Sequence, residues 1–380
     1  MQKPDDIRTT FFTPAVEKLQ SLQGTIDPSQ AAFTTDFNSK RSMVFYKYAM
    51  FAEQQYHAIL NSPDVLRLKV YAERKRQELQ QYDEKIRRSQ SDLSRNELTQ
   101  QKRKAQVLYE QDTSQFLEVT TARDTYLQHS IDMFARCLEA SDDYDDDAPY
   151  HLCSLWFSNF TNDLGTTVNT SVARVASRKF VFLAHQLSAR LSSNSNLALY
   201  SQSTLQGLLI RMCSEHPFHS MYQVYSLRSS QRRDSSRRQS NRHGHETSSQ
   251  LERTAAANDI FDKLRAMPER ESTVRNIEHL CDAYLEWAKF PIKNDSLLSE
   301  KRRKKEQTQI PQQLLISKVQ NVQVPVITAK TPLDPTLRYK DCVWIQRYSR
   351  NFDTAGGMNL PKISYCHGSD GQVYKQLVGH

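Results

Sequence analysis

The chain has little glycine, few apolar residues and no apolar run of transmembrane length. Only nine of its 380 residues are glycine, 38% are hydrophobic, and the mean hydropathy is −0.69. A compact single-domain enzyme is usually richer in apolar residues, so we expect part of the chain to be exposed helix or loop. The amino terminus lacks the charged-then-apolar pattern of a secretory signal. We therefore expect a soluble, intracellular protein of two or three domains with no membrane partner.

The cysteines and acidic residues show no spacing typical of a metal site. Six cysteines with no CxxC pair indicate buried, reduced thiols, at positions 137, 153, 213, 281, 342 and 366. The acidic run Asp142 to Asp147 lacks the glycine and the closing glutamate of an EF-hand loop, so it predicts a solvated turn. We interpret His185 and His279 as helix-surface or seam residues. His216 and His219, which flank a proline, are interpreted as capping or packing groups.

Helix-forming residues dominate until about residue 310, which predicts a mainly α protein. The first 38 residues show no sustained period and are predicted to be irregular, with Pro4, Pro14, Gly24 and Pro28. We expect helix to begin near Ser39. The sequence Asn61-Ser62-Pro63-Asp64 predicts the end of one helix and the start of the next, because proline suits the first helical position.

The helical part changes character along its length. Residues Lys69 to Lys104 place charged side chains on nearly every face of the predicted helices, which favours a pair of solvated antiparallel helices. A coiled-coil partner surface is the alternative. Later helices have one apolar face, as stacked helical pairs need. The residues of these faces are Phe180, Leu183, Ala184, Leu187 and Leu191, and then Val274, Ile277, Leu280, Tyr284 and Leu285.

Two basic segments stand apart. Arg228 to His245 has almost no apolar residue and predicts a disordered loop, which we place at 228–250. Lys301 to Lys305 reads KRRKK and is similar to a monopartite nuclear import signal, although a solvated linker fits equally well. Clustered Lys and Arg can bind nucleic acid, but no aromatic residues interleave with these charges, so direct DNA contact is not expected.

From Pro311 onward the pattern changes from helix to strand. Alternating residues around Pro325 and the run Cys342 to Tyr348 predict two strands. Gly356 and Gly357 then permit a turn that can approach a phosphate closely, although a plain turn has the same signature. The run Gly368 to Gly371 is a hairpin signal between two further strands. A small antiparallel sheet is therefore expected after the helices.

The sequence of this last segment and of four earlier blocks resembles that of the ATM branch of the phosphatidylinositol 3-kinase-related serine/threonine kinases. That branch includes the fungal telomere-maintenance and DNA-damage kinases. The last segment reads AGGMNLPKISYCHGSDGQVYKQLV, and the earlier blocks read HLCSLWFSNF, KFVFLAHQLSARL, HPFHSMYQVYSL and LCDAY. The resemblance covers roughly Phe45 to Val378 and is most specific after Thr125. It implies a FAT-type, TPR-like helical solenoid at 39–310 and the start of a kinase upper lobe, truncated, at 311–380, after the irregular segment at 1–38.

The resemblance also implies a function. The full-length kinase would use ATP and Mg to phosphorylate Ser or Thr before Gln in DNA-damage and telomere signalling in the nucleus. Its partners would be the kinase catalytic domain, a second copy bound through the FAT region, and DNA-damage sensor proteins. The residues expected to hold ATP are Thr354, Ala355, Gly356, Gly357, Met358, Asn359, Pro361 and Lys362. Among Ser-Gln and Thr-Gln pairs, Ser230 and Ser249 are the expected self-phosphorylation sites.

The sequence departs from the family after Val378. In the family, a phosphate-contacting lysine stands at the next position, where this chain has Gly379 and then His380, and Lys375 lies too early in the strand to replace it. The catalytic loop and the magnesium ligands are also missing, so we expect the isolated chain to be inactive and to need no cofactor. The alternative is a catalytically inactive helical scaffold that binds a protein partner.

Overall fold

The computed structural model describes residues 3–24, 31–89, 91–160, 165–192, 199–237, 248–291, 308–355 and 361–379. The chain divides into two compact units, Met1–Val175 and Ala176–His380. All the strands lie in the second unit, together with the helices that follow Ser177. No described helix is both long enough and apolar enough to cross a membrane.

The amino-terminal segment is helical, so the prediction of an irregular start was wrong. It forms α1 (Pro4–Ile7), a π-helical turn η1 (Arg8–Phe12) and α2 (Thr13–Gln23), and α3 (Ala31–Leu60) begins before the expected Ser39. Proline occupies the first turn of α1 and of α2, where it starts a helix rather than breaking one. Phe12 fixes the segment to α3, because its ring stacks 4.8 Å from that of Tyr48.

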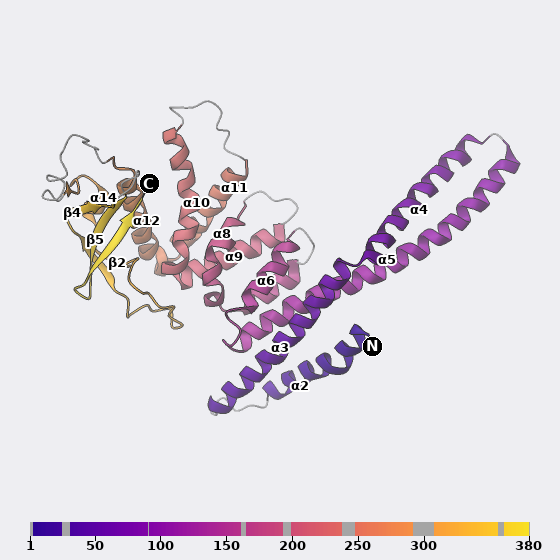
Figure 1. Ribbon diagram of the computed structural model, residues 1–380, viewed down its shortest axis with the longest axis horizontal. Helices are drawn as coiled ribbons and strands as arrows, with labels where there is room; N and C mark the ends of the chain where they lie inside the picture. Colours follow the sequence, from indigo (N-terminus) through magenta and orange to yellow (C-terminus); the bar gives the residue numbers. More distant parts are fainter. Residues whose placement is uncertain are drawn as a thin grey trace. The chain divides into compact units, whose positions relative to one another are not determined.

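The two helices predicted to be solvated and antiparallel are present. They are α4 (Pro63–Arg88) and α5 (Asp92–Ala140), which run side by side as the long pair of Figure 1. Leu79 is the buried residue of α4, and Ala105 is the first buried residue of α5. Between the helices Lys102 Nζ lies 2.5 Å from Asp83 Oδ1. The predicted helix boundary at Asn61 to Asp64 is confirmed, with α3 ending at Leu60.

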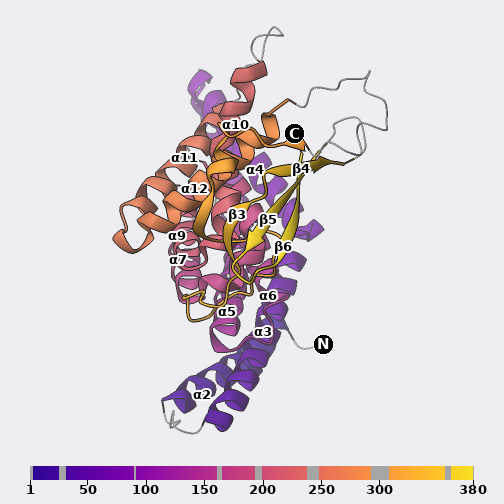
Figure 2. The ribbon, with the colours of Figure 1, turned by 90° about the vertical axis from the view of Figure 1, so that its left-hand side faces the viewer.

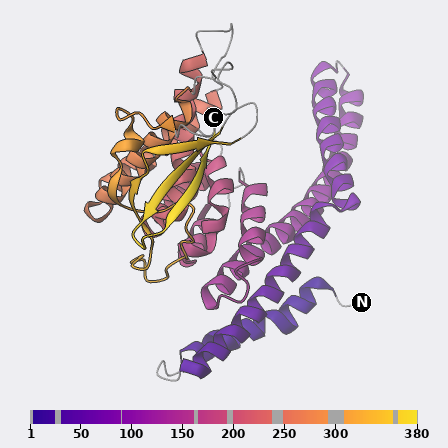
Figure 3. The ribbon, with the colours of Figure 1, turned by 60° about the vertical axis from the view of Figure 1, so that its left-hand side comes forward.

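The core of the first unit lies where the last third of α5 meets α3, α6 (Ala148–Ser158) and α7 (Gly165–Arg174), as Figure 3 shows for α3 and α5. Ser130 Oγ donates to Ala49 O at 3.0 Å, and the ring of Phe134 stacks on His151. The acidic run Asp142 to Asp147 forms the predicted turn between α5 and α6. It is held in place, because Tyr46 donates a hydrogen bond to Asp147.

The second unit begins with helices. They are a 3-10 segment η2 (Ser177–Leu183), α8 (Ala184–Ala189), α9 (Leu199–Glu215), α10 (Pro217–Arg237), α11 (Ser248–Arg265) and α12 (Pro268–Lys289). The apolar residues predicted at 180–191 are all buried, with Phe180 and Leu183 on η2, Ala184 and Leu187 on α8, and Leu191 after the end of α8. Of the apolar face predicted for α12, Val274, Ile277 and Leu280 are buried, whereas Tyr284 and Leu285 are half-buried. His185 and His279 are exposed on helices.

The prediction of a disordered basic loop at 228–250 was wrong at both ends, because α10 continues to Arg237 and α11 begins at Ser248. Arg228 explains why the helix persists beyond the predicted start of the loop. It donates hydrogen bonds to Asn258 and Glu278 and lies 4.4 Å from the ring centroid of Phe261. Residues 238–247 and the basic run Lys301–Lys305 lie outside the described residues.

The strands form the small antiparallel sheet expected from the sequence. They are β1 (Thr308–Gln309), β2 (Gln320–Pro325), β3 (Trp344–Tyr348), β4 (Asn351–Thr354), β5 (Lys362–Gly368) and β6 (Val373–Val378), with a short helix α14 (Leu315–Lys318) before β2. β5 is central: β6 pairs along one edge, and β4 and β3 share the other. Figure 2 shows β3, β5 and β6 facing the viewer.

The β5–β6 hairpin requires its glycines. Gly371 has φ of 78°, which is unfavourable for other residues, and a Cβ at Gly368 would lie 2.6 Å from the side chain of Val343. The side chains of β5 alternate between the two faces of the sheet. Those of Lys362, Ser364 and Cys366 are buried, on the face that packs on α12.

Candidate nucleotide-binding hairpin

The segment that connects β4 to β5 contains the glycine pair, and its two described ends are joined by regular antiparallel pairing. Strands β4 and β5 pair antiparallel, with Thr354 opposite Lys362 and Asp353 opposite Ile363. Beyond the last pair, the amide of Ala355 donates to Pro361 O at 2.7 Å. The structure therefore brings Thr354, Ala355, Pro361 and Lys362 together at the base of the loop. The other predicted ATP ligands, Gly356, Gly357, Met358 and Asn359, lie outside the described residues.

The side chain of Lys362 points from the hairpin to α12. It is 5% exposed, and its Nζ donates to Ala288 O at 2.9 Å. The same atom lies 5.1 Å from the centroid of the Trp287 ring. Carbonyls of the last helical turn carry partial negative charge, so Ala288 is a favourable acceptor for an ammonium. Burial lowers the pKa of Lys362 below its ordinary value.

Three side chains of α12 hold the sheet and the short helix α14. Trp287 Nε1 donates to Ser364 Oγ at 2.8 Å, and its ring meets that of Phe352 edge-on at 4.7 Å. The Tyr284 hydroxyl lies 2.6 Å from Gln376 Oε1. Glu286 accepts a hydrogen bond from the backbone of α14. The base of the glycine loop is therefore supported by one helix through β4, β5 and β6.

Sequence reasoning did not identify this support. The helical spacing of Leu280, Tyr284 and Trp287 indicates that these residues share one face of a helix, and this spacing is the signal in the sequence for a packing surface. Periodicity does not reveal which strand covers that face, and Lys362 lies 74 positions from Ala288.

The opposite face of the sheet is open in the described structure. Val373 and Leu377 of β6 are 51% and 67% exposed, and Lys375 between them is exposed as well. Lys375 lies opposite Tyr365 of β5, whose hydroxyl donates to Asp353. Lys375 thus projects from the face that α12 does not cover. In the described residues no three His, Cys, Asp or Glu side chains lie so that they could hold a metal ion.

A second connection joins α10 to the segment between β2 and β3. The Tyr339 hydroxyl lies 2.7 Å from His216 Nδ1 and 3.3 Å from His219 Nδ1, and His219 Nε2 lies 3.0 Å from Thr331 O. Burial lowers the pKa of His216 to about 4, so this ring is neutral at pH 7. The interpretation of both histidines as packing groups at a helix start is confirmed.

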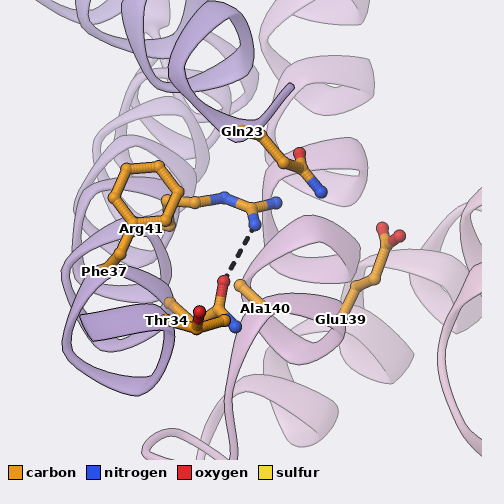
Figure 4. Close-up of a pocket in the computed structure, with 7 residues that line it drawn as sticks. Gln23, Thr34, Phe37, Arg41, Glu139 and Ala140 are labelled. Atoms are coloured by element: carbon orange, nitrogen blue, oxygen red, sulfur yellow. Dashed lines mark hydrogen bonds between the residues drawn. The ribbon is translucent and has the colours of Figure 1, made fainter. Parts of the chain in front are cut away.

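The first unit contains a separate pocket of about 280 Å³, shown in Figure 4. The ring of Phe37 lies beside the Arg41 guanidinium, and the polar side chains that line the pocket are those of Gln23, Thr34, Asn38, Arg41 and Glu139. Arg41 Nη1 donates to Asn38 Oδ1 at 3.0 Å. Burial lowers the pKa of Arg41. No residue of the predicted ATP site belongs to this pocket.

Comparison with known proteins identifies the relatives of the chain. No family model matches it. It is 29% identical over 344 residues to the serine/threonine-protein kinase TEL1 of Cryptococcus neoformans, covering 89% of this chain and 11% of that kinase. It is 28% identical over 392 residues to the serine-protein kinase ATM of Sus scrofa, covering 100% of this chain and 12% of the kinase. Its homologues are the Tel1/ATM kinases.

This Tel1/ATM homologue spans about a tenth of the length of the curated relatives it matches. It shares its fold with a solved structure, the FAT and kinase domain of CtTel1, at a TM-score of 0.69 and 24% identity. That match covers 99% of this chain and 23% of the solved one. The predicted family and the predicted fold, helices followed by a small antiparallel sheet, are both confirmed.

Proposed function

We propose that this chain is the FAT region and the first kinase strands of a Tel1/ATM-type serine/threonine protein kinase. The full-length protein would act in the nucleus, in DNA-damage checkpoint and telomere-maintenance signalling, and phosphorylate Ser or Thr before Gln. The main support is the similarity to such kinases over nearly the whole chain, together with the fold shared with the FAT and kinase domain of CtTel1.

Within that kinase, the loop from Ala355 to Pro361 would lie over the phosphates of ATP. A glycine loop on a firm base suits this role, because phosphoryl transfer depends on positioning and on charge stabilisation. Thr354 and Lys362 fix the ends of the loop, and backbone amides at Gly356 and Gly357 would donate to phosphate oxygens. Magnesium supplies positive charge at the phosphates, and we expect its ligands to come from other parts of the kinase. The isolated chain is accordingly expected to transfer no phosphate.

The proposed partners are the kinase catalytic domain, a second copy of the protein and DNA-damage sensor proteins. Similarity in fold to the complete CtTel1 dimer with C2 symmetry, at a TM-score of 0.68, supports the second of these. We expect no direct DNA contact.

The proposal is tested on the native gene product, purified from its own cells with an antibody against the α4–α5 pair. It should phosphorylate a Ser-Gln peptide in the presence of Mg-ATP. Replacing Gly356 and Gly357 together by alanine should raise the KM for ATP by roughly tenfold, since the loop would no longer fit the phosphates closely. Gly207→Ala is the matched control, because an added Cβ there meets no atom within 4 Å.

A native product that transfers no phosphate to the peptide would overturn the proposal. It would favour the alternative of a helical scaffold that binds a protein partner.

A further inference from the structure

Lys362 stands at the base of the proposed phosphate-binding loop, yet its ammonium is directed to a helix. Its Nζ is 2.9 Å from Ala288 O and 5.1 Å from the Trp287 ring centroid, and the side chain is 5% exposed. A lysine that binds phosphate needs its ammonium free to face the nucleotide. Here the charge is already bound on the opposite side of the strand.

Burial of this charge needs an explanation. An ammonium removed from water is costly unless it is paired or hydrogen-bonded, and an apolar side chain would fill the same space without that cost. The two partners of Lys362 are both suited to a cation: a carbonyl in the last turn of α12, where the helix dipole is negative, and the face of an indole ring. The contact therefore ties β5 to this one place on α12.

The position of the contact links α12 to the loop itself. Lys362 is the first residue of β5 and lies opposite Thr354, the last residue of β4. The next backbone bond outward is Ala355 N to Pro361 O at 2.7 Å, which closes the loop. A displacement of the carboxyl end of α12 is thus transmitted through Lys362 to both ends of the loop.

We propose that Lys362 is a positioning residue that couples the end of α12 to the phosphate-binding loop, and that it does not contact phosphate itself. This inference rests on the proposed function and specifies how the helical region regulates that site. Any partner or strain that shifts the end of α12 moves the base of the hairpin, where Thr354 and Lys362 pair, and thereby changes the affinity for ATP.

The first test uses this chain without nucleotide. Single-amide hydrogen exchange is measured at Ala355 in the wild type, Lys362→Met, Lys362→Arg and Lys375→Met. Methionine keeps the length of the side chain and removes the ammonium, so exchange at Ala355 should become about tenfold faster, the factor expected for one lost charge-assisted hydrogen bond. Arginine should restore most of the protection. Lys375, an exposed lysine of the neighbouring strand, is the matched control and should change nothing.

Unchanged exchange at Ala355 in Lys362→Met would overturn the inference. If this variant does not fold, Trp287→Phe provides the second measurement, because it weakens the ring contact and leaves Lys362 in place. Ser364→Ala is its control for the lost indole hydrogen bond. The inference then requires faster exchange at Ala355 in Trp287→Phe than in Ser364→Ala, and equal rates would overturn it.

The second test uses the full-length kinase. A positioning role predicts that Lys362→Met and Trp287→Phe both raise the KM for ATP several-fold while kcat changes little. It also predicts that the KM of the double variant is no higher than that of the more impaired single variant. A direct phosphate ligand predicts a large effect for Lys362→Met, a small one for Trp287→Phe and additive effects. That second pattern would overturn the inference. Failure of the proposed function is distinct: the native product would lack kinase activity while the exchange result stood.

Discussion

Glu278 of α12 joins three helices, and its loss should destabilise the second unit measurably. Its carboxylate accepts hydrogen bonds from Arg228 of α10 and from Arg265 of α11, where Nη2 lies 2.5 Å and Nε 3.1 Å away. The Glu278 side chain is only 18% exposed. Charge-assisted hydrogen bonds in such a setting contribute about 1.5–3 kcal/mol to folding.

Glu278→Gln should therefore lower the free energy of unfolding by about 2 kcal/mol, because the amide replaces a charged acceptor of two guanidinium groups. We do not expect a larger loss. Each arginine retains a second acceptor in the variant, because Arg265 also lies 2.6 Å from Asp262 and Arg228 also donates to Asn258 at 2.8 Å. For a unit of this size the loss corresponds to a decrease in Tm of about 4–8 °C. Thermal unfolding followed by circular dichroism measures it.

The effect should depend on pH in a defined direction. Burial by itself would raise the pKa of Glu278, but the hydrogen bonds and charges of Arg265 and Arg228 together outweigh it and lower the folded-state pKa below its ordinary value of 4.5. A carboxylate with a lowered folded pKa stabilises the protein above its unfolded pKa, and this contribution is lost as the pH falls through the folded pKa. The Tm difference between wild type and Glu278→Gln should have its full size at pH 7 and become smaller below about pH 4.5.

Glu271→Gln is the matched control on the same helix. Glu271 pairs with Arg275 at 2.5 Å, but these side chains are 52% and 74% exposed, so its removal should cost at most about 0.5 kcal/mol. Equal losses for the two variants, or a Glu278→Gln deficit undiminished at pH 3, would refute the reasoning.

Two further predictions concern buried groups. Tyr339→Phe removes the hydroxyl between His216 and His219 and should lower the free energy of unfolding by about 1–3 kcal/mol in urea titrations, because it leaves the buried His216 ring without this partner. Tyr374→Phe, which removes an exposed hydrogen bond from β6 to Asp370, should leave the urea midpoint unchanged. Iodoacetamide should alkylate Cys342 first in the native chain at pH 8, since the other five cysteines are buried; rapid native labelling of Cys213, whose pKa burial raises to about 12, would contradict the packing.

The sequence was most informative where the structural rule is local. Pro63 after a polar residue marked the boundary between α3 and α4, and Gly368 to Gly371 marked the hairpin between β5 and β6. Each depends on backbone angles of a few adjacent residues. The alternation around Pro325 likewise predicted β2.

The same local signals misled where distant contacts decide. Pro4 and Pro14 suggested an irregular segment, but Phe12 packs on α3 and stabilises the helices there. The basic residues from Arg228 onward suggested disorder, yet Arg228 binds α11 and α12 and extends the helix. In each case one side chain anchors a segment of weak local signal, and the partner lies on another helix.

The candidate site was predicted from the family resemblance and from its glycines. The packing of α12 that supports the site was not predicted. The hairpin pairing at Thr354 and Lys362 agrees with a loop at that place. The role of Trp287 and Ala288 depends on the docking of a helix against a strand, which no motif encodes.

The α4–α5 pair also bears on how this region can change during evolution. Helix α5 has 49 residues, roughly 74 Å of helix, yet apart from Ala105 its buried side chains lie between Tyr126 and Leu138. Removing or adding about seven residues, close to two turns, in both α4 and α5 would keep the facing sides nearly in phase and leave the core residues where they are. Homologous chains can therefore differ in the length of this arm while sharing the core at its base, and a gap of similar size in both helices is the trace this would leave in an alignment.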